Sequence, residues 1–361
     1  MKYSYKIFQI KGIDLEVHIT FIALFLFLLV LTFPQIYAVI LFMLLFLSVT
    51  IHELAHSLLA QRNQLSVNKI VLYPIGGASQ IEEIPDNPSI EWKVSVIGPV
   101  SSLIVGSLTL LIHFLFPIQL PVTPFFIGTG FILFDIGVLN IILAIFNLIP
   151  AFPMDGGRVL RALLTVWKKD LIQATQIAAS IGRFFAIIFL IIGFIGNIWL
   201  IIIGMFIYWG AAQELETTKL STILKPMRVG DVMLSMDSIM TVDPSTPLNE
   251  ALEVMFRTRI NDLIVCKGGD LLGVITWEDI VKIAPEVRYV TRVGDLRIKS
   301  LSLRPDHSVF DAYKLMAKEK AQLIPVADSN TPCNIIGVIT NQSIAYGLAL
   351  RRSSSDTSIG Y

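Results

Sequence analysis

Charged residues are scarce in this chain, and cysteines are almost absent. Only 16% of its 361 residues are charged, the 28 basic residues balance 28 acidic ones, and the chain contains 2 cysteines. With a net charge of zero, nothing in the composition suggests nucleic acid or an acidic substrate, so we expect no nucleic-acid partner. Cys266 and Cys333 have no zinc-ribbon spacing and no disulfide framework. We therefore expect both to be reduced thiols.

The charges that do occur avoid long stretches of the N-terminal half. No charged residue lies between Thr20 and Ile51, and hydrophobic residues make up 54% of the whole chain. A run of about 20 apolar residues is long enough to cross a bilayer as a helix. The sequence therefore predicts a polytopic α-helical membrane protein with six transmembrane helices, near residues 17–34, 36–60, 93–117, 124–149, 173–195 and 197–215.

Basic residues gather in alternate connections between these apolar runs. They lie before the first predicted helix, between the second and third, and between the fourth and fifth. The connections near 33–36, 117–124 and 195–198 contain none. By the positive-inside rule, both termini face the cytoplasm. We therefore expect a multi-pass protein of the cell membrane whose charge-rich region, from about 225 onwards, is cytoplasmic.

A metal-binding pattern lies at the end of the second apolar run. Residues 50–58 read Thr-Ile-His-Glu-Leu-Ala-His-Ser-Leu, which places His52 and His56 one turn apart on one helix face. Both can direct an imidazole nitrogen at one Zn²⁺, and Glu53 lies where it could take a proton from metal-bound water. Such short patterns also recur by chance in soluble helices. Its apolar context favours function, because buried ionisable groups are costly unless they are paired or bind metal.

A catalytic zinc also needs a third protein ligand, and Asp155 is the best candidate. It lies in Asn147-Leu-Ile-Pro-Ala-Phe-Pro-Met-Asp-Gly-Gly, at the end of the fourth predicted helix and on the same side of the membrane as the histidines. Two prolines break the helix there. The alternative is that Asp155 only caps the helix that follows. We expect one zinc ion per chain, held by His52, His56 and Asp155.

With these residues, the membrane half resembles the site-2 protease family of intramembrane metalloproteases. His-Glu-Leu-Ala-His matches the first family motif, and Asn-Leu-Ile-Pro…Pro-Met-Asp-Gly-Gly matches the second. The resemblance implies that His52, His56 and Asp155 bind the zinc. It also implies that Glu53 is the catalytic acid/base and that Asn147 contacts the substrate backbone or the oxyanion. Asn147 could instead hold helices together, as lone asparagines in membrane helices often do.

Residues 64–84 are rich in β-branched residues and are interrupted by Pro74-Ile-Gly-Gly. This composition is typical of a short β-hairpin. The family resemblance implies an exposed edge strand here, which holds an unwound substrate as an added strand. A plain loop hairpin is the alternative.

Two isolated polar residues, His113 and Asp135, lie within apolar runs. A mutual pair, a water-filled entry path and a structural hydrogen bond are all consistent with their positions. We assign neither residue to the metal site.

The C-terminal part contains an internal repeat. Val229-Gly-Asp-Val returns as Val293-Gly-Asp-Leu, and Leu272-Gly-Val-Ile-Thr returns at the same offset as Ile336-Gly-Val-Ile-Thr. Each copy predicts a β-α-β-β-α-like unit. In the first copy we expect two strands around 263–265 and 272–275.

This repeat resembles a tandem pair of cystathionine-β-synthase (CBS) domains, an α/β fold. We place the two domains at 225–287 and 288–350, after a protease domain at 1–216 and before a disordered tail at 351–361. The resemblance implies that the pair binds an adenine nucleotide such as ATP, ADP or AMP. Thr276 and Asp279 match the Thr-x-x-Asp pattern, whose acid accepts hydrogen bonds from ribose hydroxyls. The second copy has Ser343 instead, so a homodimerisation or docking module without a ligand is the alternative.

The whole sequence predicts a zinc endopeptidase that cuts transmembrane segments of proteins in the lipid bilayer near the cytoplasmic side. Zinc lowers the pKa of bound water, and Glu53 takes its proton and then donates to the leaving amine. An adenine nucleotide at the CBS pair would regulate the reaction. Two alternatives are a CBS-regulated transporter or channel, which need not contain zinc, and a metal-binding pseudoprotease scaffold, which differs only in activity.

Overall fold

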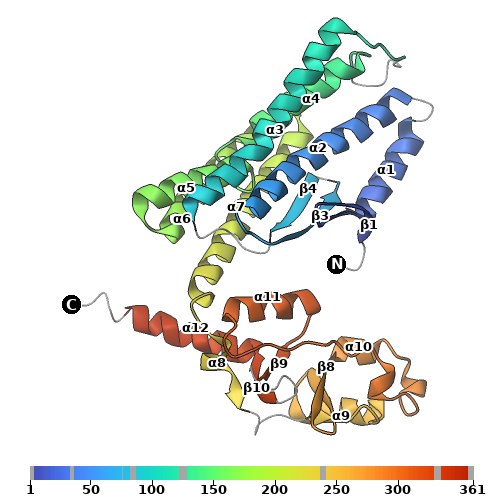
Figure 1. The fold of residues 1–361 in the computed structure, drawn as a ribbon, viewed down its shortest axis with the longest axis vertical. Helices are drawn as coiled ribbons and strands as arrows, with labels where there is room; N and C mark the ends of the chain where they lie inside the picture. The colour runs from blue at the N-terminus through green and yellow to red at the C-terminus, as the bar shows by residue number, and fades with distance from the viewer. Residues whose placement is uncertain are drawn as a thin grey trace. The chain divides into compact units, whose positions relative to one another are not determined.

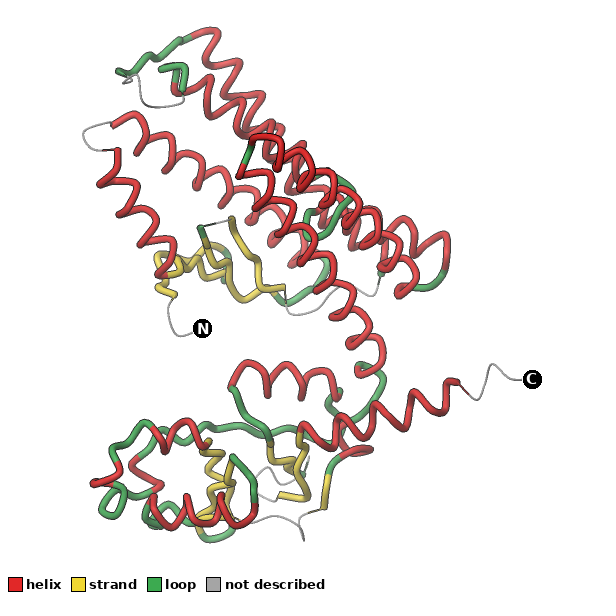
Figure 2. The backbone as a smooth tube through the Cα atoms, turned by 180° about the vertical axis from the view of Figure 1, so that it is seen from behind, coloured by secondary structure: helices red, strands yellow, loops and turns green. Residues whose placement is uncertain are grey.

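The computed structural model describes residues 4–32, 36–74, 76–81, 87–121, 128–235, 241–328 and 335–356. The chain divides into two compact units, Met1–Thr218 and Lys219–Tyr361. Figures 1 and 2 show long helices in the N-terminal unit, and shorter helices with small sheets in the C-terminal unit.

Among the described residues of the N-terminal unit, six helices are strongly apolar: α1 (Ile19–Thr32), α2 (Ile36–Arg62), α3 (Pro88–Leu115), α4 (Ile132–Asn147), α6 (Leu171–Gly196) and α7 (Ile198–Leu224). Four of them, α2, α3, α6 and α7, are long and apolar enough to cross a membrane. In contrast, α1 and α4 have 14 and 16 residues. Six crossings therefore stay a prediction, whereas the expected division of the last apolar stretch into two helices is confirmed at Asn197.

A four-stranded sheet accompanies these helices, with strand order β1 (Ser4–Ile10), β2 (Ile13–His18), β3 (Val67–Tyr73), β4 (Gly76–Ile81). β2 and β3 are parallel, and the outer pairs are antiparallel. The hairpin predicted at 64–84 is confirmed as β3 and β4. The first helix, predicted from residue 17, begins at Ile19 because Ile13, Leu15 and Val17 alternate with polar residues and bury one face of a strand.

α3 packs against α2, α4 and α5 (Asp155–Lys168). Small residues permit the close approach to α4, since a Cβ on Gly106 would lie 2.9 Å from the carbonyl oxygen of Gly137. α4 ends at Asn147, two residues before the predicted end at 149, and α5 begins after the proline-containing segment that follows. The start of α5 therefore lies beside α3, which positions Asp155.

A buried ion cluster joins α3, α5 and α7. Arg161 of α5 is only 1% exposed. Its Nε donates to Oε1 of Glu91 on α3 at 2.7 Å, and its Nη1 donates to Oε1 of Glu214 on α7 at 2.7 Å. Nη1 also lies 3.3 Å from the hydroxyl of Thr218. Burying this guanidinium is tolerable because both carboxylates and a hydroxyl accept its hydrogen bonds.

Asp135 and His113 meet different partners. Asp135 accepts hydrogen bonds from the hydroxyl of Tyr37, and from the backbone N–H and hydroxyl of Thr129 at 2.8 and 3.0 Å. The centroid of the His113 ring lies 5.3 Å from the centroid of the Phe131 ring. Within the described residues the two do not bond to each other, and the structural hydrogen bond is the interpretation that fits Asp135.

The C-terminal unit consists of two similar halves. The first contains β6 (Thr241–Val242), α9 (Leu248–Thr258), β7 (Asp262–Lys267), β8 (Asp270–Thr276) and α10 (Trp277–Val281). The second contains α11 (Val309–Glu319), β9 (Leu323–Ala327), β10 (Ile335–Thr340) and α12 (Asn341–Asp356), and β5 (Leu234–Ser235) pairs with β10. The strands predicted around 263–265 and 272–275 are confirmed as β7 and β8, and they pair antiparallel.

The repeated Val-Gly-Asp motifs exchange contacts between these halves. The N–H of Gly230 donates to the carbonyl oxygen of Pro305 at 3.0 Å, and the N–H of Gly294 donates to that of Pro244 at 2.8 Å. The motif that precedes each half therefore packs against the other half.

The expectations for the C-terminal tail and for the cysteines concern residues that are only partly described. The tail expected to be disordered from 351 is helical as far as Asp356, since α12 continues without a proline to end it, and 357–361 lie outside the described residues. Cys266 is a free thiol, and Cys333 lies outside the described residues.

Candidate metal centre

Three side chains predicted to bind metal converge on one point in the N-terminal unit. His52 and His56 lie on α2, and Asp155, the first residue of α5, lies 99 positions after His56. The two Nε2 atoms are 3.1 Å apart, and each is 3.2 Å from Oδ2 of Asp155. All three residues are buried. Tertiary packing has thus brought a carboxylate to two imidazoles inside the protein.

The geometry and chemistry of this cluster fit a zinc ion. Imidazole nitrogen and carboxylate oxygen are ordinary zinc ligands, and at zinc bond lengths two tetrahedral ligand atoms lie about 3.3 Å apart. The distances of 3.1 and 3.2 Å are close to that value. Gly98 of α3 keeps the adjoining space free of side-chain atoms, because a Cβ there would overlap Nε2 of His56 and lie 2.7 Å from Nε2 of His52.

α3 also orients both imidazole rings. Nδ1 of His56 lies 2.5 Å from the carbonyl oxygen of Val94, which can only accept, so this nitrogen carries the proton. Nδ1 of His52 lies 2.9 Å from Oγ of Ser102. Partners at Nδ1 leave each Nε2 directed at the shared point, which is how metal-binding histidines are commonly fixed.

Asp155 does not have the role of helix cap that the sequence left open. The N-cap residue of α5 is Met154, and Asp155 is the first helical residue. Burial raises the pKa of the Asp155 carboxyl, but its close contacts with the imidazoles of His52 and His56 outweigh this effect and hold the pKa well below its usual range. The carboxylate is therefore ionised at neutral pH, as a metal ligand has to be.

Glu53 lies beside the cluster in a cleft of about 380 Å³. β4 forms one wall of this cleft through Gly76 and Gly77. A Cβ on Gly77 would overlap Cγ of Glu53 and lie 3.1 Å from its Cδ, so glycine is what lets the strand pass the carboxylate. β4 is last in the sheet order, and its outer edge has no strand partner among the described residues.

Asn147 lies in the same cleft, at the last position of α4. Its Nδ2 donates to the carbonyl oxygen of Leu143 at 2.9 Å, within its own helix. The structure thus brings Asn147 into the cleft with the metal cluster, with part of its hydrogen-bonding capacity used locally.

Val94, Gly98 and Ser102 did not emerge from the sequence as site residues. They lie four positions apart on α3 and form the face that packs on the histidines. The available signal was a glycine and a serine at helical spacing within an apolar run, followed by Gly106 at the same spacing. Small residues at that spacing indicate a helix contact but do not say which helix is contacted.

In the C-terminal unit, Thr276 and Asp279 contact each other. The hydroxyl of Thr276 donates to Oδ2 of Asp279 at 2.6 Å, and Nζ of Lys299 lies 3.2 Å from the same oxygen. Burial raises the pKa of Asp279, but these contacts outweigh it and lower the pKa overall. In the second half Ser343 replaces the acid, and its Oγ accepts from the backbone N–H of Thr340 at 3.0 Å.

Comparisons with known proteins cover both units. The model of peptidase family M50 matches residues 40–126 and 123–192, and the CBS domain model matches 229–286 and 293–349. A zinc metalloprotease of Methanocaldococcus jannaschii is 38% identical over 291 residues, which cover 80% of this chain and 82% of that protein. A solved site-2 protease from the same organism is 41% identical, with a TM-score of 0.47, over 59% of this chain and 95% of that one. A CBS-pair protein of Arabidopsis thaliana solved with AMP is 27% identical, with a TM-score of 0.31, over 35% of this chain and 98% of that one.

Proposed function

Because this chain belongs to peptidase family M50, the site-2 proteases, and is a zinc metalloprotease with a pair of CBS domains, we propose that it cleaves transmembrane segments of other membrane proteins. The observation that carries this proposal is the buried cluster of His52, His56 and Asp155. Its two histidines lie on α2, a helix long and apolar enough to cross a membrane. A substrate has to reach that helix to be cut. A CBS-regulated transporter or channel is set aside, because the family is one of proteases.

In this proposal, His52, His56 and Asp155 hold one zinc ion per chain. Bound there, zinc lowers the pKa of a water molecule to about 7 and polarises the scissile carbonyl. Glu53, in the same cleft, takes the proton of the attacking water and delivers it to the leaving amine. Asn147 contacts the substrate backbone or the oxyanion from the end of α4.

β4 is the proposed binding surface for the substrate backbone. A carbonyl within a helix is shielded by its hydrogen bond, so the segment to be cut has to unwind locally. An unwound segment added to the outer edge of β4 would continue the sheet and pass Glu53 at Gly77. The presence of Gly76 and Gly77 of β4 in the cleft with Glu53 supports the edge-strand interpretation over that of a plain hairpin.

We propose six membrane crossings, with both termini and the CBS pair in the cytoplasm. The support is the alternation of basic and uncharged connections in the sequence. In this arrangement the protease domain spans 1–216, the CBS domains span 225–287 and 288–350, and cleavage takes place near the cytoplasmic side.

The CBS pair is the proposed site of regulation by ATP, ADP or AMP, and of homodimer formation. The support is the Thr276 and Asp279 pair, where the carboxylate of Asp279 is held ionised beside Lys299 and its side chain is 23% exposed. The carboxylate could exchange local bonds for ribose hydroxyls, and Lys299 supplies a positive charge for phosphate.

Zinc content and cleavage, measured on one preparation of the full-length protein in detergent, test the proposed protease. The wild type should hold one zinc per chain and cut a membrane-inserted test segment, and Asp155→Ala should lose both properties. The matched control is Asp170→Ala, which removes an aspartate at the start of α6 whose role is to cap that helix. Full zinc content in Asp155→Ala would show that another residue is the third ligand. Zinc-loaded wild type that cuts no membrane-inserted segment would favour the pseudoprotease scaffold.

A further inference from the structure

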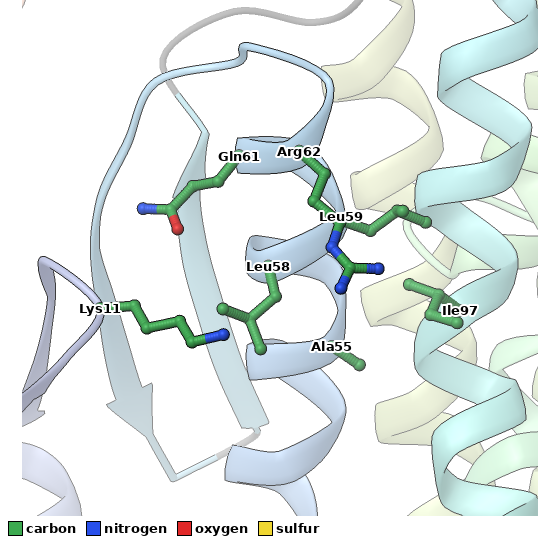
Figure 3. Close-up of a pocket in the computed structure, with 7 residues that line it drawn as sticks. All are labelled: Lys11, Ala55, Leu58, Leu59, Gln61, Arg62 and Ile97. Carbon is green, nitrogen blue, oxygen red and sulfur yellow. The ribbon is translucent and has the colours of Figure 1, made fainter.

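A groove separate from the metal cleft lies where the β1–β2 turn meets α2 and α3. It has a volume of about 450 Å³. Figure 3 shows that Lys11 extends from the turn toward Leu58, while Arg62 directs its guanidinium back along α2, toward Ile97 of α3. The rest of its wall is mainly apolar and includes Leu59. The groove therefore combines two cations with an apolar wall.

The two cations of this groove differ from the lysines of the nearby sheet, which form ion pairs. Nζ of Lys6 lies 2.5 Å from a carboxylate oxygen of Asp14, and Nζ of Lys69 lies 2.9 Å from one of Glu16. Among the described residues, neither Lys11 nor Arg62 has an ion-pair partner. The positive-inside rule accounts for cations at this end of a helix, but it does not require two of them to line one apolar groove.

A third cation lies on the same side of α3. Lys93 precedes Ile97 by four positions, so it lies one turn away on the same helix face. Lys93 is exposed and is also without an ion pair among the described residues. Three elements that are distant in sequence thus each place a positive charge at or near the groove.

We propose that this groove binds the phosphate of an anionic phospholipid, with an acyl chain along the apolar wall. The groove lies on the last turns of α2, one of the helices able to cross a membrane, and Arg62 is the final residue of that helix. A ligand there needs a negative head to pair with Lys11 and Arg62, and an apolar body to cover Leu58, Leu59 and Ile97. A phospholipid has both parts. Since His56 precedes Arg62 by six positions on α2, a bound headgroup would also hold the metal-binding turn at a fixed depth.

Native mass spectrometry of the full-length protein in detergent tests this proposal with phosphatidylglycerol as the probe. Each basic residue near an anionic lipid is worth a factor of about five in affinity, so Lys11→Gln/Arg62→Gln should bind the lipid about 30-fold more weakly than the wild type. The control is Lys168→Gln/Lys169→Gln, which removes the same charge from exposed positions at the end of α5 and should bind like the wild type. Phosphatidylcholine, which has no net negative charge, should bind the wild type more weakly than phosphatidylglycerol.

Two outcomes would overturn the proposal. Equal loss of lipid in the test and control variants would mean that general charge, and not the groove, attracts phosphatidylglycerol. Displacement of the lipid by millimolar glycerol phosphate would assign the groove to a free phosphate group, because a ligand held partly by its acyl chain should resist a competitor that has none.

Discussion

Asp155 and Asp279 both lie at the start of helices, but their carboxylates meet different kinds of partner. Asp155 faces two histidines that lie 99 and 103 positions away in the chain. Asp279 bonds to Thr276, three positions away, in a capping box of α10. The local contact is explained by helix formation alone, because capping boxes stabilise many helices. The convergence at Asp155 has no such local explanation, and it costs energy unless something is bound there.

Among the variants considered for the metal centre, Gly98→Ala should have the largest effect on zinc binding. In Gly98→Ala the new Cβ would occupy the space beside Nε2 of both histidines. We expect zinc affinity to fall by about 100-fold or more, with loss of cleavage. Zinc content after dialysis measures the effect.

A second glycine on α3 separates this effect from general damage to helix packing. In Gly106→Ala the Cβ would press on Gly137 of α4, away from the histidines. We expect this variant to melt at a lower temperature and to keep its zinc. Full zinc retention in Gly98→Ala would show that the metal lies elsewhere.

Glu53→Gln should leave zinc in place and lower the cleavage rate by about 10²- to 10⁴-fold. The amide fills the same space beside Gly77 but cannot accept a proton from water. Turnover of a membrane-inserted segment, normalised to zinc content, is the measurement. Normal turnover per zinc would remove Glu53 from the reaction.

Arg161→Met should show how much the buried ion cluster stabilises the packing of α3, α5 and α7. The change leaves Glu91 buried without its cation, which costs about 3–5 kcal/mol of folding free energy. Lys168→Met, at an exposed position on the same helix, should cost less than about 1 kcal/mol.

The double variant Arg161→Met/Glu91→Gln sharpens this prediction. Because it also removes the unpaired buried charge, it should recover part of the lost stability. Thermal melting in detergent compares the variants. A double variant that is less stable than Arg161→Met would contradict this explanation of the cluster.

The three metal ligands could be predicted from the sequence because each lies in a short, recognisable sequence motif. His52 and His56 are related by a single helical turn, and the prolines before Asp155 indicated where the preceding helix ends. Gly98 and Arg161 were not predictable in the same way, because their roles depend on which helix faces meet. The β1–β2 hairpin was missed although residues 13–18 alternate regularly, since a charge-free run follows directly and drew the helix boundary toward the N-terminus.

Asp279→Ala has the smallest expected effect, and it tests whether Asp279 in the CBS pair binds a ligand, as Asp155 is proposed to do in the metal centre. If Asp279 does more than cap α10, the full-length protein should bind ATP, ADP or AMP, and the variant should bind it about 1.5–3 kcal/mol more weakly. Ser343→Ala is the matched control, because Ser343 makes the equivalent local bond in the second half and should matter only for stability. Calorimetry in detergent measures the binding.

The same titration decides whether such a site regulates the protease. By linkage, a nucleotide changes cleavage only if it binds two arrangements of the CBS pair unequally, so its addition should shift the wild-type rate and have less effect on Asp279→Ala. No heat of binding at millimolar nucleotide would leave Asp279 with the capping role that the structure already explains, and would leave the pair as a docking or dimerisation module. Binding with an unchanged rate would separate the ligand site from regulation. In either case, an acid that matches a family pattern but is held by local bonds would be weaker evidence for a ligand than one held by residues far away in the chain.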